Sequence, residues 1–370
     1  MSWKRLFSRS LDAAPGRLHF AAHSHHLWPD ASFAGQVEAW EDAAALADRK
    51  WDKVMGPVWS EAQRHIAAEL ALPDPATIAF APNTHDFLVR IVSALPASRP
   101  RVLATDGEFH SFRRQALRWH EAGEIELTTV PAGDLLRTAQ SGTFDLIYAS
   151  QVLFNSGQTI GDLAPLAALA RPDGPWVVVD GYHGFMATPT DLSGVADRIF
   201  YLAGGYKYAM AGEGACFLHT PPGFAPRPVV TGWYAAFDDL AVAQGGVGYA
   251  PDGRRFIGST FDPSGLYRFN AVQRMLASEG LSTAIISAHV ASLQARFLAA
   301  DPLPSFTLIS GKQARFLAFN GAGAAVLQAA LDARDVITDV RGDVLRIGFG
   351  IYHDAEDVNR LVAVLADLQA

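Results

Sequence analysis

The sequence predicts an α/β protein whose large domain is built on a mostly parallel sheet. Two apolar runs, at 176–179 and 199–202, are typical of strands that are buried on both faces of such a sheet. Strand and helix patterns alternate ahead of these runs, which indicates right-handed crossovers. Near residue 280 the pattern changes to a smaller α+β unit. We therefore expect a large domain at 31–279, and a small domain formed by 1–30 together with 280–370.

The elements of the large domain follow one another in a regular order. Residues 34–71 predict two helices that are separated at Gly56-Pro57, because proline cannot continue a helix. Trp40, Trp51 and Trp59 in this stretch are expected to be packing residues. Asn83 and its neighbours predict the start of a helix that runs to Leu95. Further strands are predicted at 101–105, 145–150 and 215–218.

The small domain is predicted to combine short strands with amphipathic helices. Strands are expected at 306–309, 315–319 and 344–349, and helices are expected to begin near Ala322 and after Asp354. The last helix has one apolar face, formed by Val358, Leu361, Val362, Leu365 and Leu368.

The bulk composition is that of a globular protein. The chain has 370 residues, of which 49% are hydrophobic and 18% are charged. A net charge of −8 argues against nucleic acid or an anionic membrane as a partner. The single cysteine, Cys216, fits a reducing compartment, and no apolar run approaches the length of a membrane span. We expect a cytoplasmic protein with a short basic arm at residues 1–10.

An acidic residue and a lysine follow the two central strands. Asp180 ends the first run, and Lys207 follows the second run after Gly204-Gly205. Both positions are at the carboxyl ends of parallel strands, where open α/β sheets place their ligands. Pyridoxal 5′-phosphate needs this pair, because a lysine binds its aldehyde as a Schiff base and a carboxylate keeps its ring nitrogen protonated. Taken alone, Asp180 could simply cap a turn, and Lys207 could simply be a solvated surface lysine. Taken together, the two residues predict a cofactor site.

This stretch resembles the class V aminotransferases of pyridoxal-phosphate fold type I, and within them kynureninase. Asp180-x-x-His183 is similar to the D-x-x-H of kynureninases, and Tyr206-Lys207-Tyr208 is similar to their Y-K-Y. Further similarities follow in chain order at 19–29, 150–157, 230–233 and 344–358. The resemblance implies an amino acid substrate, catalytic roles for Lys207, Asp180 and His183, and a homodimer with shared active sites.

The resemblance also implies a set of cofactor-binding residues. Thr84 and the backbone of His85 stand at a predicted helix N-terminus, whose free N–H groups suit a phosphate, although an ordinary helix cap fits the sequence equally well. Phe109 is expected to stack on the pyridine ring, with His110 as the second candidate. The other members of the set are Asp180, His183, Tyr206, Lys207, Trp233 and Thr260. Thr260 lies in a turn that either reaches the phosphate of the neighbouring subunit or is a plain surface turn.

The substrate end of the site is expected to contain an arginine and two histidines. Arg346 stands in an otherwise apolar strand, where an arginine is costly unless it meets an anion. Its planar fork suits a carboxylate, and the resemblance assigns it to the substrate α-carboxylate. His25 and His26 belong to segment 17–30, which the resemblance places at the same end. Four histidines gather there without a Cys, Asp or Glu among them, so we expect no metal.

The motifs favour a kynureninase-like hydrolase that cleaves the Cβ–Cγ bond of a kynurenine-like substrate. Two departures from kynureninase point to an altered substrate. His23-Ser24-His25-His26-Leu27 replaces an N-S-L-G-L segment, and Phe112 stands where an acid is expected. A class V aminotransferase is the first alternative. A catalytically silent homologue is the second, although the presence of Asp180, Lys207 and Arg346 argues against it.

Two further activities are disfavoured by the sequence. Cysteine desulfurases resemble this fold but need a reactive cysteine on a mobile loop, whereas Cys216 lies in a predicted buried strand. The glycines at 204, 205, 212 and 214 do not follow the dinucleotide-binding fingerprint.

Overall fold

The computed structural model describes residues 2–239, 245–309 and 314–369, and a seven-stranded sheet forms the centre of this part of the chain. Its strands are β2 (Ile78–Ala81), β3 (Arg101–Thr105), β4 (Glu126–Val130), β5 (Leu146–Ser150), β6 (Trp176–Asp180), β7 (Ile199–Gly204) and β8 (Cys216–His219). They are ordered β2-β8-β7-β6-β5-β3-β4. β3 to β7 run parallel, and β8 is antiparallel to both of its neighbours. The predicted α/β fold is confirmed.

The apolar runs form the centre of the sheet because they can be buried on both faces. Every residue of β5, β6 and β7 is buried. Their side chains belong to one large hydrophobic core, which includes Phe87, Val178 and Leu202. Since β5, β6 and β7 are parallel, their carboxyl ends at Ser150, Asp180 and Gly204 meet at one edge.

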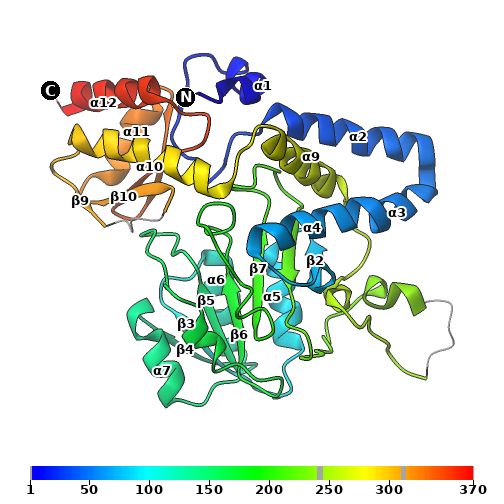
Figure 1. The fold of residues 1–370 in the computed structure, drawn as a ribbon. Helices are drawn as coiled ribbons and strands as arrows, with labels where there is room; N and C mark the ends of the chain where they lie inside the picture. The colour runs from blue at the N-terminus through cyan, green and yellow to red at the C-terminus, as the bar shows by residue number, and fades with distance from the viewer. Residues whose placement is uncertain (1, 240–244, 310–313, 370) are drawn as a thin grey trace.

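Helices pack around this sheet and extend beyond it (Figure 1). They are α2 (Asp30–Leu46), α3 (Lys50–Lys53), α4 (Trp59–Leu70), α5 (Thr84–Ser93), α6 (His110–Glu121), α7 (Leu135–Ser141), α8 (Ala164–Ala167) and α9 (Ser264–Ser278). In the described part of the chain, no helix has both the length and the apolar character that a membrane crossing requires.

A second sheet of four strands lies in the C-terminal part. Its order is β12 (Asp339–Arg341), β13 (Val344–Gly348), β10 (Phe316–Asn320) and β9 (Thr307–Leu308), with every neighbouring pair antiparallel. The helices of this part are α10 (Thr283–Ala299), α11 (Ala324–Asp332) and α12 (Ala355–Gln369). A separate hydrophobic core contains Val358, Leu361 and Leu365, as the amphipathic pattern of the last helix predicts.

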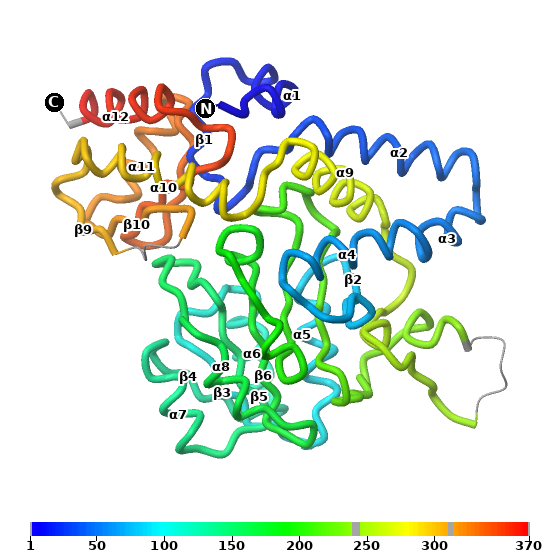
Figure 2. Tube along the Cα trace, in the orientation of Figure 1, coloured from blue at the N-terminus to red at the C-terminus, as the bar shows by residue number. Residues whose placement is uncertain are grey.

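The N-terminal segment joins the C-terminal part of the molecule. After α1 (Ser8–Asp12), β1 (Leu18–His19) pairs in parallel with β11 (Val336–Ile337), and Ala21 bridges to Gly348. Both termini consequently lie on the same side of the molecule (Figure 2). The division into 31–279 and 1–30 with 280–370 stays a prediction.

Two local predictions for the helices α2 to α4 are wrong. Gly56-Pro57 does not separate two helices, because Val54–Val58 forms a π-helical turn that continues from α3 into α4 and accommodates the proline. The chain reverses instead at Ala47, which has a positive φ of 51°. Trp40, expected to be a packing residue, is 71% exposed on α2, whereas Trp59 is buried.

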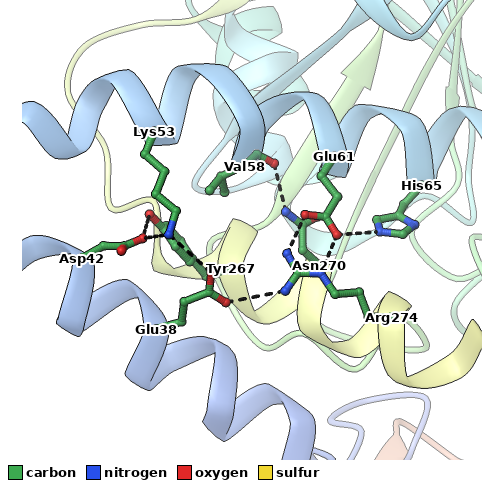
Figure 3. Close-up of polar contacts among 9 residues, drawn as sticks. All are labelled: Glu38, Asp42, Lys53, Val58, Glu61, His65, Tyr267, Asn270 and Arg274. Atoms are coloured by element: carbon green, nitrogen blue, oxygen red, sulfur yellow. Dashed lines mark hydrogen bonds and ion pairs between the residues drawn. The ribbon is translucent and has the colours of Figure 1, made fainter. Parts of the chain in front are cut away.

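Ion pairs between charged side chains connect α2, α3, α4 and α9 (Figure 3). Arg274 of α9 pairs with Glu61 of α4 at 2.5 Å and with Glu38 of α2 at 3.6 Å. Lys53 pairs with Asp42 at 2.6 Å, and Asp42 also accepts a hydrogen bond from the Tyr267 hydroxyl. Because these charged groups are partly exposed to solvent, we ascribe the cohesion of these helices mainly to the packing of α2 against α9 rather than to the ion pairs.

Gly35 marks the closest approach of α2 to α9, and Gly35→Ala is expected to destabilise the protein. A Cβ at this position would lie 2.6 Å from the carbonyl oxygen of Tyr267, so the helices would have to move apart. We expect a loss of about 1–2 kcal/mol in the free energy of unfolding, after the higher helix propensity of alanine is allowed for. Urea denaturation measures it. Gly56→Ala is the matched control, since a Cβ there meets no atom within 4 Å; an equal loss in both variants would contradict the packing argument.

Candidate active site

A cavity of about 550 Å³ opens at the carboxyl edge of the central sheet. Eight of the residues predicted for the site line it: Thr84, His85, Phe109, Asp180, His183, Tyr206, Lys207 and Arg346. They come from strand ends, from the start of α5 and from β13, which are far apart in the sequence. The remaining lining residues were not predicted: Ser24, Asn83, Ser111, Ser150, Tyr182 and Arg341.

Asp180 is a buried carboxylate at the end of β6. Its Oδ2 accepts a hydrogen bond from the Tyr148 hydroxyl at 2.9 Å, and its Oδ1 accepts one from the backbone N–H of Tyr182 at 2.9 Å. Phe112 stacks on the Tyr148 ring, with ring centroids 4.0 Å apart. The position where the resemblance to kynureninase implies an acid is therefore occupied by a packing residue. Burial raises the pKa of Asp180, and the two hydrogen bonds and the charge of Lys207 oppose this. The carboxylate is thus held rigidly and is poorly solvated.

Lys207 is a buried amine in the same cavity. It follows β7 through Gly204-Gly205, and its Nζ donates a hydrogen bond to the His23 carbonyl oxygen at 2.7 Å. Burial, and then the charge of Arg346, lowers the pKa of Lys207 to about 7, while Asp180 acts in the opposite direction. A lysine with this pKa has a large neutral fraction at physiological pH, and the neutral amine is the nucleophilic form.

α9 supports the loop that carries this lysine. The Arg268 Nε donates to the carbonyl of Ala211 at 2.8 Å, and its Nη2 donates to the carbonyl of Glu213. A Cβ on Gly265 would lie 2.7 Å from the backbone of Gly214, so the helix touches the loop backbone directly. The loop after Lys207 is therefore fixed by contacts far from the cavity.

The N-terminus of α5 supplies an anion-binding element. Asn83 caps the helix by accepting a hydrogen bond from the Asp86 N–H at 2.9 Å, as the sequence predicts. Thr84 and His85 form the first turn and line the cavity. The His85 Nδ1 is buried and has no hydrogen-bond partner among the described residues. The position of this first turn at the cavity and the helix dipole suit a phosphate.

Arg346 is held in a fixed orientation within β13. Its Nη1 donates to the Phe154 carbonyl at 2.6 Å, and its Nη2 pairs with Asp339. Its Nε is buried without a partner in the described part of the chain, and its guanidinium lies 5.8 Å from the ring centroids of both Phe154 and Phe316. Burial lowers the pKa of Arg346 to about 10, so it stays protonated at neutral pH. The arginine thus lines the cavity as a cation that is held in place by protein contacts.

Phe109 and His183 lie on one aromatic side of the cavity. Phe109 is 37% exposed and contacts Phe154 edge to face at 5.3 Å, and its ring centroid lies 6.4 Å from that of His183. Burial lowers the pKa of His183 well below its usual value, so the imidazole is neutral. An exposed ring beside a neutral imidazole offers a flat surface to an aromatic ligand.

Neither His25 nor His26 is among the residues that line the cavity. The His25 Nδ1 lies 3.0 Å from the Tyr206 hydroxyl, so His25 reaches the cavity only through Tyr206. His26 does not line the cavity; it is buried against Phe7 and Tyr352, and its Nδ1 lies 2.8 Å from the Leu27 carbonyl. Across the described ranges, no three His, Cys, Asp or Glu side chains are grouped as metal ligands.

Trp233 and Thr260 are not among the residues that line the cavity. Trp233 is 44% exposed and packs against Tyr234 and Phe237. Thr260 is exposed. The structure therefore does not bring these two residues together with the other predicted site residues in one chain.

A buried acid below the cavity was not predicted. Glu108 accepts hydrogen bonds from the hydroxyls of Thr105 and Ser150 at 2.5 Å each, and from the Ser150 N–H at 3.0 Å. Burial raises its pKa to about 7. Because Ser150 pairs with Asp180 across β5 and β6, Glu108 fixes the strand end next to the site. The only signal in the sequence was an acid directly before Phe109.

Comparisons with known proteins agree on the architecture. No family model matches the chain. An uncharacterised aminotransferase of Bacillus subtilis, YcbU, is 24% identical over 329 residues, which cover 84% of this chain and 86% of that protein. The cystine C–S lyase C-DES, with glycine covalently linked to its pyridoxal-phosphate cofactor, superposes with a TM-score of 0.84 at 18% identity, over 99% of this chain and 100% of the other. The cysteine desulfurase CsdA of Escherichia coli superposes with a TM-score of 0.82 at 19% identity, over 99% of this chain and 97% of the other.

The chain has the fold of these enzymes. It is the fold-type I architecture, in the form shared by class V aminotransferases and cysteine desulfurases. Kynureninase, which the sequence motifs resemble, is not among the proteins compared above. Cys216, the single cysteine of the chain, is buried in β8, and burial raises its pKa to about 12. A thiol in this state is a poor nucleophile.

Proposed function

We propose that this protein is a pyridoxal 5′-phosphate-dependent enzyme that acts on an amino acid, with transamination as its reaction. The observation that carries the proposal is that Lys207 and Asp180, both buried, line one cavity together with the N-terminus of α5. These groups match the aldehyde, the ring nitrogen and the phosphate of the cofactor. The fold shared with fold-type I enzymes gives independent support.

In this proposal the main polar groups of the cavity have distinct tasks. The bound cofactor supplies an electron sink that stabilises negative charge at the substrate Cα. Asp180 holds the ring nitrogen protonated, and the start of α5 with Tyr206 binds the phosphate. Lys207 moves the proton at Cα, and Arg346 orients the substrate by its α-carboxylate. That Thr260 completes the site of a neighbouring subunit in a homodimer stays a prediction.

Transamination is preferred over the other reactions for residue-level reasons. A desulfurase needs a thiol nucleophile, and Cys216 is buried and protonated. A kynureninase-like hydrolase, which the motifs favour, remains the second candidate; it would have to bind an aromatic side chain without Trp233, which lies outside the cavity lining. The similarity to YcbU supports the first choice. A silent homologue would not need a buried lysine whose pKa is lowered to about 7.

One incubation separates the two leading reactions. The holoenzyme is given a panel of L-amino acids, including L-kynurenine, with and without added pyruvate. We expect the amino acid to be consumed in stoichiometric amounts with alanine formation only when pyruvate is present. Anthranilate and alanine formed from kynurenine without any keto acid would establish the hydrolase instead.

The capture of the cofactor by the cofactor-free protein is expected to depend on pH around neutrality. Only the neutral amine attacks an aldehyde, and the lowered pKa of about 7 makes Lys207 neutral far below the range of an ordinary lysine. The rate should therefore rise with pH and level off above about pH 8, instead of rising towards about pH 10. Stopped-flow absorbance from below neutral pH up to about pH 10 measures this rate. A rate that still climbs through pH 9 would contradict the lowered pKa.

Arg346→Lys is expected to weaken substrate capture without disturbing the cofactor. Lysine keeps the charge but loses the planar fork that binds a carboxylate at two points. We expect kcat/KM to fall about 10²-fold, mainly through KM, while the visible spectrum of the holoenzyme stays unchanged. Steady-state kinetics and an absorbance scan test both parts. A collapsed spectrum would mean that Arg346 supports the cofactor rather than the substrate.

A further inference from the structure

A second arginine lines the same cavity as Arg346. Arg341 ends β12, two residues after Asp339, so the two side chains leave the same face of the strand. Asp339 lies directly opposite Arg346 in the register of β12 and β13. Its Oδ1 accepts a hydrogen bond from Arg341 Nη1 at 2.6 Å, and its Oδ2 pairs with Arg346 Nη2. One carboxylate is therefore shared by two cations, which leaves an excess of positive charge.

The two arginines differ in how much of the guanidinium is already engaged. The Arg346 side chain is 3% exposed, and both of its Nη atoms are anchored. The Arg341 side chain is 40% exposed, and both hydrogen bonds that the described residues give it leave from Nη1, to Asp339 and to the Val340 carbonyl. Because Arg341 lines the cavity, its Nε and Nη2 are available to a ligand there.

Positive charge dominates the cavity and its surroundings. The lining residues include two arginines, Arg341 and Arg346, but only one carboxylate, Asp180. A neighbouring hollow of about 780 Å³ shares His85 and Ser111 with the cavity. Three arginines of α6 line this hollow, Arg113, Arg114 and Arg118, and the one acid among its lining residues is Glu121. In a chain with a net charge of −8, such a concentration of cations attracts anions to this mouth.

We propose that Arg341 determines substrate specificity by binding a second carboxylate, so that the substrate is an amino acid whose side chain ends in a carboxylate. This inference rests on the proposed function, in which Arg346 takes the α-carboxylate. Each arginine fork matches one carboxylate, and a second cation at the outer end of the cavity selects a second anion. A neutral side chain, such as that of kynurenine, offers Arg341 no second carboxylate.

A pair of non-reacting ligands tests this at equilibrium. Glutarate carries two carboxylates, and glutaramate has the same shape with one carboxylate replaced by an amide. Calorimetric titration of the holoenzyme at low ionic strength should show glutarate binding at least about tenfold more tightly. Arg341→Gln should bring the two dissociation constants within about twofold and leave that of glutaramate unchanged, while Arg341→Lys should give an intermediate preference.

Arg137→Gln is the matched control, because it removes the same charge from a 77% exposed side chain on α7, away from the cavity lining. It should keep the full preference for glutarate. The proposal is overturned if wild-type protein binds both ligands equally, or if the preference survives in Arg341→Gln. It is also overturned if Arg341→Gln weakens both ligands equally, since Arg341 would then act only by supporting Arg346.

The proposed function can fail separately from this inference. Neither ligand has an amino group, so their binding does not depend on any reaction of an amino acid. A protein that prefers glutarate through Arg341 but does not turn over any amino acid would refute the proposed function and leave the second carboxylate site standing.

Discussion

Lys207→Ala is expected to abolish covalent attachment of the cofactor and to lower kcat by at least about 10³-fold. Lys207 is the one lysine among the lining residues, and its buried amine has a pKa of about 7, which suits both attachment and proton transfer. No neighbouring amine can replace it, because the other cations of the lining are arginines. Borohydride reduction of the wild-type holoenzyme followed by peptide mapping should place the cofactor on Lys207.

Lys50→Ala provides the comparison for this variant. Lys50 belongs to α3, away from the cavity lining, so removing its amine should leave the borohydride-labelled peptide and kcat unchanged. Label on a peptide that does not contain Lys207, or turnover that survives Lys207→Ala, would refute the assignment.

Asp180→Asn should have the second largest effect. The amide keeps the shape of the side chain and can still contact Tyr148 and Tyr182, but it can no longer hold a protonated ring nitrogen by charge. The lost stabilisation acts where negative charge develops at the substrate Cα, so we expect kcat to fall about 10²–10³-fold, or about 3–4 kcal/mol. Bound cofactor, measured by its absorbance after gel filtration, should be retained at saturating concentration.

The exposed Asp191 offers the same substitution outside the cavity lining, where its side chain accepts a hydrogen bond from the Ser193 N–H. Asp191→Asn should change neither kcat nor cofactor retention. Near-wild-type turnover of cofactor-loaded Asp180→Asn would show that the carboxylate does not support the reaction.

The central strands and the cofactor pair could be predicted because their signals are local. β6 and β7 are uninterrupted apolar runs, and Asp180 and Lys207 follow them directly, so the parallel pairing brings both to one edge. The cap at Asn83 is equally local, since its acceptor and the helix start are three residues apart. For these features, short-range pattern and tertiary structure agree.

Apart from Arg346, the substrate end could not be predicted because it depends on long-range register. Asp339 and Arg341 meet Arg346 only through the pairing of β12 with β13, and the Asp339–Arg341 spacing of two was the sole hint in the sequence. In the sequence Glu108 resembles an ordinary loop acid, and only its contact with Ser150 of β5 in the structure reveals its role. Trp40 was expected to be a packing residue from its type alone, yet its side chain on α2 is exposed to solvent.

The pairing of the two ends of the chain sets the order in which the protein can mature during synthesis. β1 needs β11, which lies more than three hundred residues later, and the His23 carbonyl that accepts the Lys207 hydrogen bond lies four residues after the end of β1. Contacts of such high sequence separation form late. The central sheet can assemble once β8 has left the ribosome, but the lysine amine acquires its final surroundings only after β11 has emerged. Nascent chains that are arrested before residue 336 are therefore expected to contain a folded sheet and an immature cofactor pocket.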